Sequence, residues 1–237
     1  SHWISRYIVE TLQKYHIDFP KENTLITCGK LIERDKSSSD KLFGLTMLHL
    51  LGEKLDYQYQ TMVSSLDTVK DLTLQDSLDL AELKAKCGLP VDYEWLNKYR
   101  EETMKGSVYY RFKNDRSVYS NEMMNTLQVY RILQADSLKD SKDEMQKIRD
   151  YFYNQKTLSR TSHWRNTYES AMILRTLSDD LKQSLGEEKK KVRFSGAMQE
   201  EIVQFPYEKK VPAEGVPDIS QNGTSPVYLS VSSSYGD

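Results

Sequence analysis

The chain has 237 residues, of which 33 are basic and 35 acidic, and its formal net charge at pH 7 is −2. This length allows one large domain, or one domain with a smaller appendage. The balanced charge favours neither nucleic acid nor an anionic membrane as a partner. No run of 18 apolar residues and no signal-peptide pattern is present, so we expect no direct membrane span. Because the chain opens with Ser1 rather than Met, we expect it to be a segment cut from a longer protein or a processed protein.

Helical periodicity dominates the first three quarters of the chain. From Ile4 onward, apolar residues fall at i, i+3, i+4, i+7 and i+8, which defines one helix face. Pro20, Gly88 and Pro90 interrupt the pattern. We predict helices over residues 4–15, 21–35, 41–51, 57–69, 73–86, 93–103, 121–134, 141–155 and 164–184. The third is apolar on nearly all sides, so we expect it to be buried on more than one face.

Short segments of strand character lie at two places in the chain. Residues 106–119 are rich in aromatic residues and contain Asn114-Asp115, which predicts a loop or a short β-hairpin with its turn at this pair. After a charged connector over 187–191, strand patterns occupy 192–194, 201–205 and 226–231. We therefore predict a helical domain over residues 1–186 and, over 187–237, a β-strand segment that belongs to a flanking sandwich.

Buried and half-exposed helices alternate in this prediction, with a spacing of about 35 to 47 residues between comparable points. Such alternation indicates stacked helical hairpins. Two architectures satisfy it, an open solenoid and a closed α/α toroid with an inner and an outer ring, and the period alone does not choose between them.

Catalytic motifs are not evident in the sequence. The histidines form no metal-binding pair, and no nucleophile elbow, P-loop or dinucleotide fingerprint is present. His49, inside the most apolar helix, is interpreted as an interior or pocket-lining residue, and the acidic pair Asp179-Asp180 as solvated. Cys28 and Cys87 lie outside any metal-like spacing and are expected to be free thiols, with a disulfide as the alternative. We predict no catalytic, cofactor-binding or metal-binding residue in this chain.

Tyrosine is unusually frequent, with sixteen residues. Tyrosine combines a large contact area with a polar tip, so it suits interfaces and sugar-facing clefts, and it also fills boundaries between core and solvent. The clusters are Tyr57/Tyr59, Tyr93/Tyr99, Tyr109/Tyr110/Tyr119 and Tyr151/Tyr153.

Residues 164–174 (WRNTYESAMIL) resemble a signature near the end of the helical thioester domain of α2-macroglobulins and complement proteins. Residues 108–110 (VYY) followed by 120–127 (SNEMMNTL) resemble an earlier copy, in which an aromatic loop leads into an inner helix. Residues 205–206 (FP) and 223–230 (GTSPVYLS) resemble the strands that follow this domain in large bacterial members of the Bacteroidetes type.

The resemblance implies an α/α toroid whose N-terminal hairpins are missing, followed by part of a β-sandwich. It also implies protease trapping in the periplasm or at the cell surface, with proteases and other domains of the same longer chain as partners. The family's thioester requires a Cys-x-Glu-Gln run. Neither Cys28-Gly29-Lys30 nor Cys87-Gly88-Leu89 supplies one, so we expect no thioester residue in this segment.

Two other functions are compatible with the same pattern. One is an α/α-toroid polysaccharide lyase or glycosidase, for which Glu122 and Glu169, near the starts of two inner helices, would be the acidic residues to test. The other is a helical-repeat scaffold that binds a protein partner along a concave face.

Overall fold

A computed structural model describes residues 2–33, 36–53, 57–112, 121–158, 164–185, 191–196, 199–203, 207–210 and 217–222, with 227, 229 and 231. The described chain is mainly helical and carries two small antiparallel sheets. It divides into two compact units, Ser1–Tyr153 and Asn154–Asp237. Helices give way to strands between residues 185 and 191. Whether residue 186 is a domain boundary stays a prediction.

The helices follow the predicted order, with most ends within a few residues of the expected ones. They are α1 (His2–Lys14), α2 (Lys21–Leu31), α3 (Ser38–Leu50), α4 (Tyr57–Ser65) with the 3-10 turn η1 (Leu66–Thr68), α5 (Leu74–Lys86), α6 (Tyr93–Asn97), α7 (Glu122–Ala135), α8 (Lys142–Leu158) and α9 (Thr167–Leu185).

Several helix ends are fixed by local side-chain chemistry. Ser37 caps α3 by accepting a hydrogen bond from the Asp40 amide, and Thr73 and Asp76 form a reciprocal capping box at the start of α5. Such bonds satisfy amide groups that the first helical turn leaves without partners. At the other end of α5, Gly88 has φ 68°, a conformation that glycine adopts without steric cost.

The sixth helix is shorter than predicted, and a β-hairpin follows it. The sequence predicted a helix over 93–103, but α6 ends at Asn97 and β1 (Arg100–Glu102) follows. This strand pairs antiparallel with β2 (Val108–Tyr110). The turn between them uses Gly106 at φ 80°, whose amide donates to the Thr103 carbonyl. A turn was predicted at 114–115, which lies outside the described residues.

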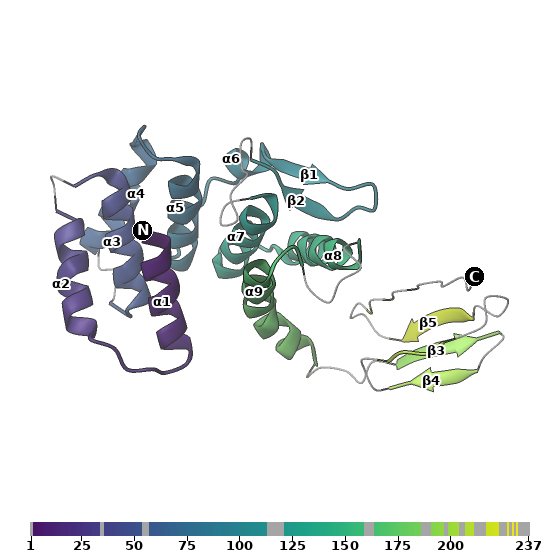
Figure 1. The fold of residues 1–237 in the computed structure, drawn as a ribbon. Helices are drawn as coiled ribbons and strands as arrows, with labels where there is room; N and C mark the ends of the chain where they lie inside the picture. The colour runs from purple at the N-terminus through teal and green to yellow at the C-terminus, as the bar shows by residue number, and fades with distance from the viewer. Residues whose placement is uncertain are drawn as a thin grey trace. The chain divides into compact units, whose positions relative to one another are not determined.

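In the first unit, helices two apart in chain order lie next to each other in space. α3 packs against α5, and α5 packs against α7, while α2 packs against α3, and α4 packs against both α3 and α5. Figure 1 shows α1 to α5 side by side. One apolar core joins α3, α4, η1 and α5 through Leu42, Leu45, Val63, Leu66, Leu80 and Leu83. A second joins α1, α2 and α3 through Val9, Cys28, Met47, Leu48 and Leu51. α3 contributes to both cores, which confirms its predicted burial on more than one face.

Gly44 sets the approach of α2 to α3. A Cβ at this position would lie 2.9 Å from Ile32 Cγ2 and 3.0 Å from the Cys28 carbonyl oxygen. Both distances are shorter than ordinary van der Waals contacts, so the two helices meet closely only because residue 44 has no side chain.

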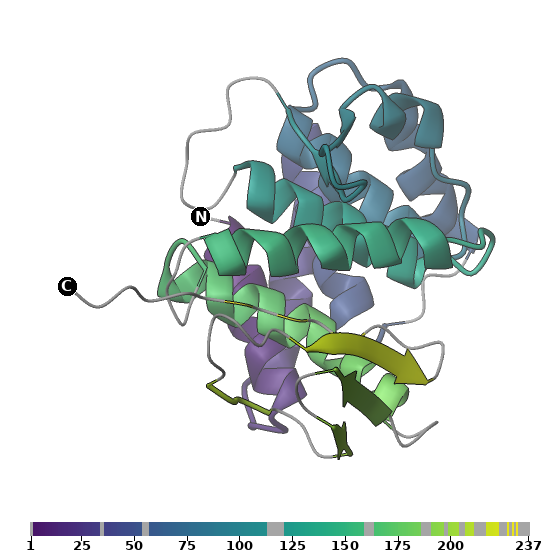
Figure 2. The ribbon, with the colours of Figure 1, turned by 90° about the vertical axis from the view of Figure 1, so that its right-hand side faces the viewer.

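The second unit contains α9 and a three-stranded sheet in the order β4-β3-β5 (Figure 2). β3 (Lys191–Ser195) and β4 (Glu200–Ile202) agree with predicted strands, and the buried Val192 and Ile202 face each other across the pair. β5 (Asp218–Asn222) was not predicted, because all five of its residues are exposed and Ile219 is its one apolar side chain. The strand predicted over 226–231 lies mostly outside the described residues.

Candidate functional site

Glu122, the first residue of α7, is one of the two predicted acidic candidates. Asn121 caps the helix, because its Oδ1 accepts hydrogen bonds from the amides of Met123 and Met124. The Glu122 carboxylate accepts from Tyr151 Oη at 2.7 Å and from Arg111 Nε at 2.8 Å. Arg111 therefore forms an ion pair with this carboxylate, and the buried Tyr151 donates a hydrogen bond to it.

Tyrosine rings surround Glu122 on the hairpin and on α8. The rings of Tyr109 and Tyr151 stack with centroids 5.1 Å apart, and the Arg111 guanidinium lies 5.1 Å from the Tyr109 ring. Burial, reinforced by the hydrogen bond to Glu122, raises the pKa of Tyr151. The hydrogen bond to Glu101 raises the pKa of Tyr109. With raised pKa values, both phenols stay protonated at neutral pH and are less available as general bases. This argues against a lyase function for these tyrosines.

Glu169, the second candidate, lies in the first turn of α9 and is fully buried. Its amide donates to Asn166 Oδ1 at 2.8 Å, while the Trp164 amide donates to Ser170 Oγ at 3.1 Å. These bonds fix the start of α9. Glu122 and Glu169 belong to different compact units.

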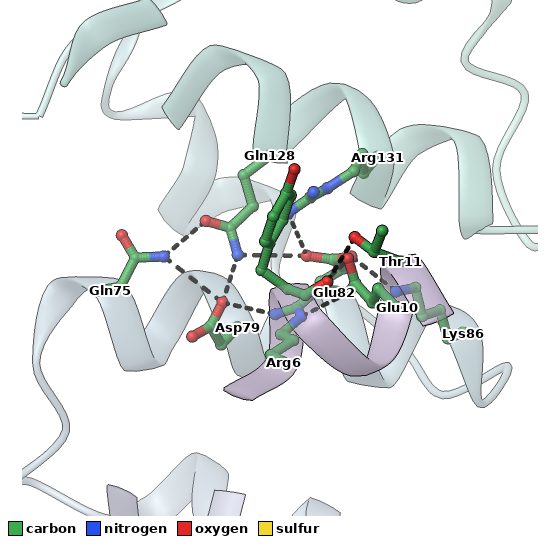
Figure 3. Close-up of polar contacts among 10 residues, drawn as sticks. Arg6, Glu10, Thr11, Gln75, Asp79, Glu82, Lys86, Gln128 and Arg131 are labelled. Carbon is green, nitrogen blue, oxygen red and sulfur yellow. Dashed lines mark hydrogen bonds and ion pairs between the residues drawn. The ribbon is translucent and has the colours of Figure 1, made fainter. Parts of the chain in front are cut away.

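The most extensive polar site in the first unit was not predicted from the sequence. Eight residues from three helices form it, and we call it the charged cluster (Figure 3). Its members are Arg6 and Glu10 on α1, Gln75, Asp79, Glu82 and Lys86 on α5, and Gln128 and Arg131 on α7.

Arg6 makes the contacts that connect α1 to α5. Its guanidinium donates to Glu10 at 2.9 Å, to Asp79 at 3.1 Å and to Glu82 at 2.9 Å. The Glu82 side chain is only 2 % exposed and also receives Lys86 at 2.8 Å and Arg131 at 3.2 Å.

Gln128 completes the cluster from α7. Its amide nitrogen donates to Asp79 at 2.6 Å and to Glu82 at 3.3 Å, and its oxygen accepts from Gln75 at 2.7 Å. Three cations and three carboxylates are thus brought together, and their formal charges cancel.

The pKa values within the cluster shift in directions that follow from burial and pairing. Burial opposes ionisation of Glu82, but Arg131, Arg6 and Lys86 hold its pKa well below the usual value. Burial also opposes the charge on Arg6, yet its three carboxylate neighbours hold its pKa well above the usual value. For Asp79, burial outweighs the attraction of Arg6, so its pKa is raised.

The spacing of the polar residues on α5 was visible in the sequence, but their burial was not. Gln75, Asp79, Glu82 and Lys86 follow i, i+4, i+7 and i+11, a spacing that places polar side chains on one helix face. Such a face is normally exposed to solvent. Here α1 and α7 cover this face. Side chains on those two helices provide the opposite charges and hydrogen bonds that offset the cost of burying it.

A small cavity of about 10 Å³ adjoins the cluster, and it has room for roughly one water molecule. His49 lines it, in agreement with the predicted pocket-lining role, and the buried Thr46 Oγ1 has no hydrogen-bond partner among the described residues. His49 Nδ1 lies 3.8 Å from Cys87 Sγ. Burial lowers the pKa of His49 and raises that of Cys87, so both are neutral at pH 7 and the thiol is not activated as a nucleophile.

Cys28 and Cys87 are both free thiols, as expected. Within the described ranges, no three His, Cys, Asp or Glu side chains are grouped in a way that would hold a metal ion. None of the described helices is long and apolar enough to cross a membrane. Comparisons with protein-family models, curated proteins and solved structures find no match to this chain.

Proposed function

We propose that this chain is a non-catalytic part of an α2-macroglobulin-like protease trap, with its helices forming most of an α/α toroid and its strands part of the flanking sandwich. The observation that carries the proposal is the succession of contacts from α3 to α5 to α7, with α2 and α4 packed against these helices. Alternate helices that are neighbours are typical of two-layered helical hairpin arrays.

A short internal sequence match supports a repeat of helical hairpins. Residues 125–133 (NTLQVYRIL) on α7 and 166–174 (NTYESAMIL) at the start of α9 share their first two and last two residues, at an interval of 41. This interval falls inside the predicted period. Gln128 and Glu169 occupy equivalent positions in the match, and both are buried.

The chemistry of the predicted acidic residues favours this proposal over a lyase or glycosidase. Glu122 is paired with Arg111, and the neighbouring Tyr151 has a raised pKa. A glycosidase requires two carboxyl groups on either side of one bond, and the first unit offers Glu122 only in an ion pair. We therefore assign no catalytic residue to this chain, and a location in the periplasm or at the cell surface belongs to the same proposal.

The test uses the complete gene product that carries residues 1–237. Trypsin is incubated with this gene product, which is present in molar excess. Cleavage is then followed with casein and with a small chromogenic peptide. A trap surrounds the protease without blocking its active site, so we expect casein cleavage to fall while peptide cleavage persists. Heat-unfolded gene product is the control. Equal cleavage of both substrates, or equal loss of both, would contradict the proposal.

A further inference from the structure

The turn of the hairpin between β1 and β2 carries a methionine that is fully exposed to solvent. Met104 has a relative exposure of 107 %, the highest value among the large apolar side chains in the described part of the chain. A single exposed apolar residue is common on protein surfaces, but a methionine here places a polarizable sulfur atom in water. The chemistry of that sulfur therefore matters more at this position than its packing.

Backbone hydrogen bonds hold this turn without help from the Met104 side chain. The Thr103 amide donates to the Ser107 carbonyl at 2.8 Å, and the Gly106 amide donates to the Thr103 carbonyl at 2.9 Å. The hydroxyl oxygens of Thr103 and Ser107 lie 2.7 Å apart. β1 and β2 pair antiparallel directly before and after the turn. A chemical change at the Met104 sulfur therefore leaves these bonds in place.

The other methionines in the described ranges are less accessible than Met104. Three are buried in helices, namely Met47, Met124 and Met172. Three more are half-buried, namely Met62, Met123 and Met145. Met47 is 2 % exposed and lies in the core shared by α1, α2 and α3. An oxidant dissolved in water reaches such a sulfur only when the surrounding structure opens, so it should react more slowly than Met104.

The two cysteines compete poorly for an oxidant at neutral pH. The thiolate, rather than the thiol, is the form that peroxides oxidise readily. Cys28 is buried, and Cys87 is half-buried beside His49. Burial raises the pKa of both thiols, so both stay protonated at pH 7. Met104 is therefore the most accessible oxidisable sulfur among the residues that the structure describes.

We propose that Met104 is a site of reversible oxidation by hydrogen peroxide and related peroxides. A sulfur lone pair attacks one peroxide oxygen, the O–O bond breaks and an S–O bond forms. With hydrogen peroxide, the products are methionine sulfoxide and water, so the sulfur loses the two electrons that the peroxide gains. The new oxygen atom lies in water, so the first unit keeps its stability and the sulfoxide is accessible to methionine sulfoxide reductases. This inference does not depend on the proposed function.

The experiment treats chain 1–237 with hydrogen peroxide at pH 7 and follows the added mass of an oxygen atom on individual tryptic peptides. Peptides 101–105 and 42–54 each contain a single methionine, Met104 and Met47 respectively. We expect Met104 to react at least about tenfold faster than Met47 in the folded chain, because the Met47 sulfur is reached only when its core opens. In concentrated urea, which removes this protection, the two rates should become equal.

Met104→Leu is the test variant, and Met47→Leu is its matched control. Met104→Leu should abolish the fast phase of oxygen uptake by the intact chain, whereas Met47→Leu should leave that phase unchanged. Chain oxidised at Met104 alone should keep its midpoint of urea unfolding, and the two reductases, which act on opposite sulfoxide epimers, should restore its original mass.

Four results would overturn the inference. They are equal oxidation rates at Met104 and Met47 in the folded chain, faster oxidation of Cys87 than of Met104, a lower unfolding midpoint after oxidation of Met104, and a sulfoxide that resists both reductases. The casein and peptide assay is independent of all four, so the oxidation site and the protease trap can be rejected separately.

Discussion

Arg6→Met removes the cation that connects α1 to α5 while keeping much of the side-chain volume. The variant leaves the Asp79 carboxylate with only the neutral donors Gln128 and Gln75, at 2.6 and 3.5 Å. Glu82 is less affected, because Lys86 and Arg131 remain beside it. The cost should therefore come mainly from Asp79 and Glu10, two carboxylates that both lose Arg6 and whose side chains are 29 % and 13 % exposed.

Removing one partner of a buried ion pair costs about 3–5 kcal/mol. Because the Asp79 side chain is 29 % exposed and can also take up a proton, we expect a loss at the lower end of this range, about 3 kcal/mol, at pH 8. Asp79 already has a raised pKa, and removal of Arg6 raises it further. At pH 5 the native carboxyl of the variant is protonated more readily than in the unfolded chain, so the loss should be smaller there than at pH 8.

Urea unfolding followed by circular dichroism at pH 8 and pH 5 measures both effects. Lys147→Met is the control, because its partner Asp143 is 84 % exposed, and it should cause no measurable change. In the Arg6→Met/Asp79→Asn double variant, we expect part of the lost stability to return, because residue 79 then carries no charge while Glu10 still lacks Arg6. A loss equal to that of the control, or one that grows between pH 8 and pH 5, would refute the reasoning.

Three further outcomes can be measured on the same chain. Gly44→Ala should lose about 1–3 kcal/mol of stability in urea unfolding, because the added Cβ meets the neighbouring helix. Gly29→Ala, whose Cβ would have nothing within 4 Å, should gain up to about 1 kcal/mol. The reverse order would contradict the close approach of the two helices. Asn121→Ala should lose about 1 kcal/mol of stability, because it removes the cap of α7. Asn121→Asp retains the acceptor oxygen and should keep most of that stability. In an alkaline titration followed at 295 nm, Tyr110 and Tyr151 should ionise only on unfolding, because burial is the main cause that raises both pKa values; full ionisation of all tyrosines near pH 10 in the folded chain would contradict this.

The helices were predictable because their apolar periodicity and their breakers are local signals. Gly88 and the residues around Pro20 interrupt the pattern where α5 and α1 end, and the helix predicted to start at Asn121 does start there, with Asn121 as its cap. The short strand β1 was not, because Arg100, Glu101 and Glu102 carry no strand pattern of their own. Arg100 is held by its ion pair with Glu144 and Tyr109 by its bond to Glu101, both of which depend on tertiary contacts.

The charged cluster could not be predicted, although each of its parts was present in the sequence. The i, i+4 pair of Arg6 and Glu10 has the same spacing as a solvated helix pair. The pair differs from a solvated one because Gln128 and Arg131 of α7, about 120 residues later in the chain, contact the same cluster. Periodicity identifies the polar face of a helix, but it does not reveal that another polar face covers it.

The charged cluster also has a consequence for the order of folding. Arg6 meets Asp79 and Glu82 across separations of 73 and 76 residues, and Gln128 meets them across 49 and 46. Contacts this far apart in sequence carry a large loop-closure cost and form late. Attachment of α1 should therefore follow the transition state, so that Arg6→Met accelerates unfolding and leaves the refolding rate almost unchanged. The cluster would then determine how long the first unit stays folded rather than how quickly it forms.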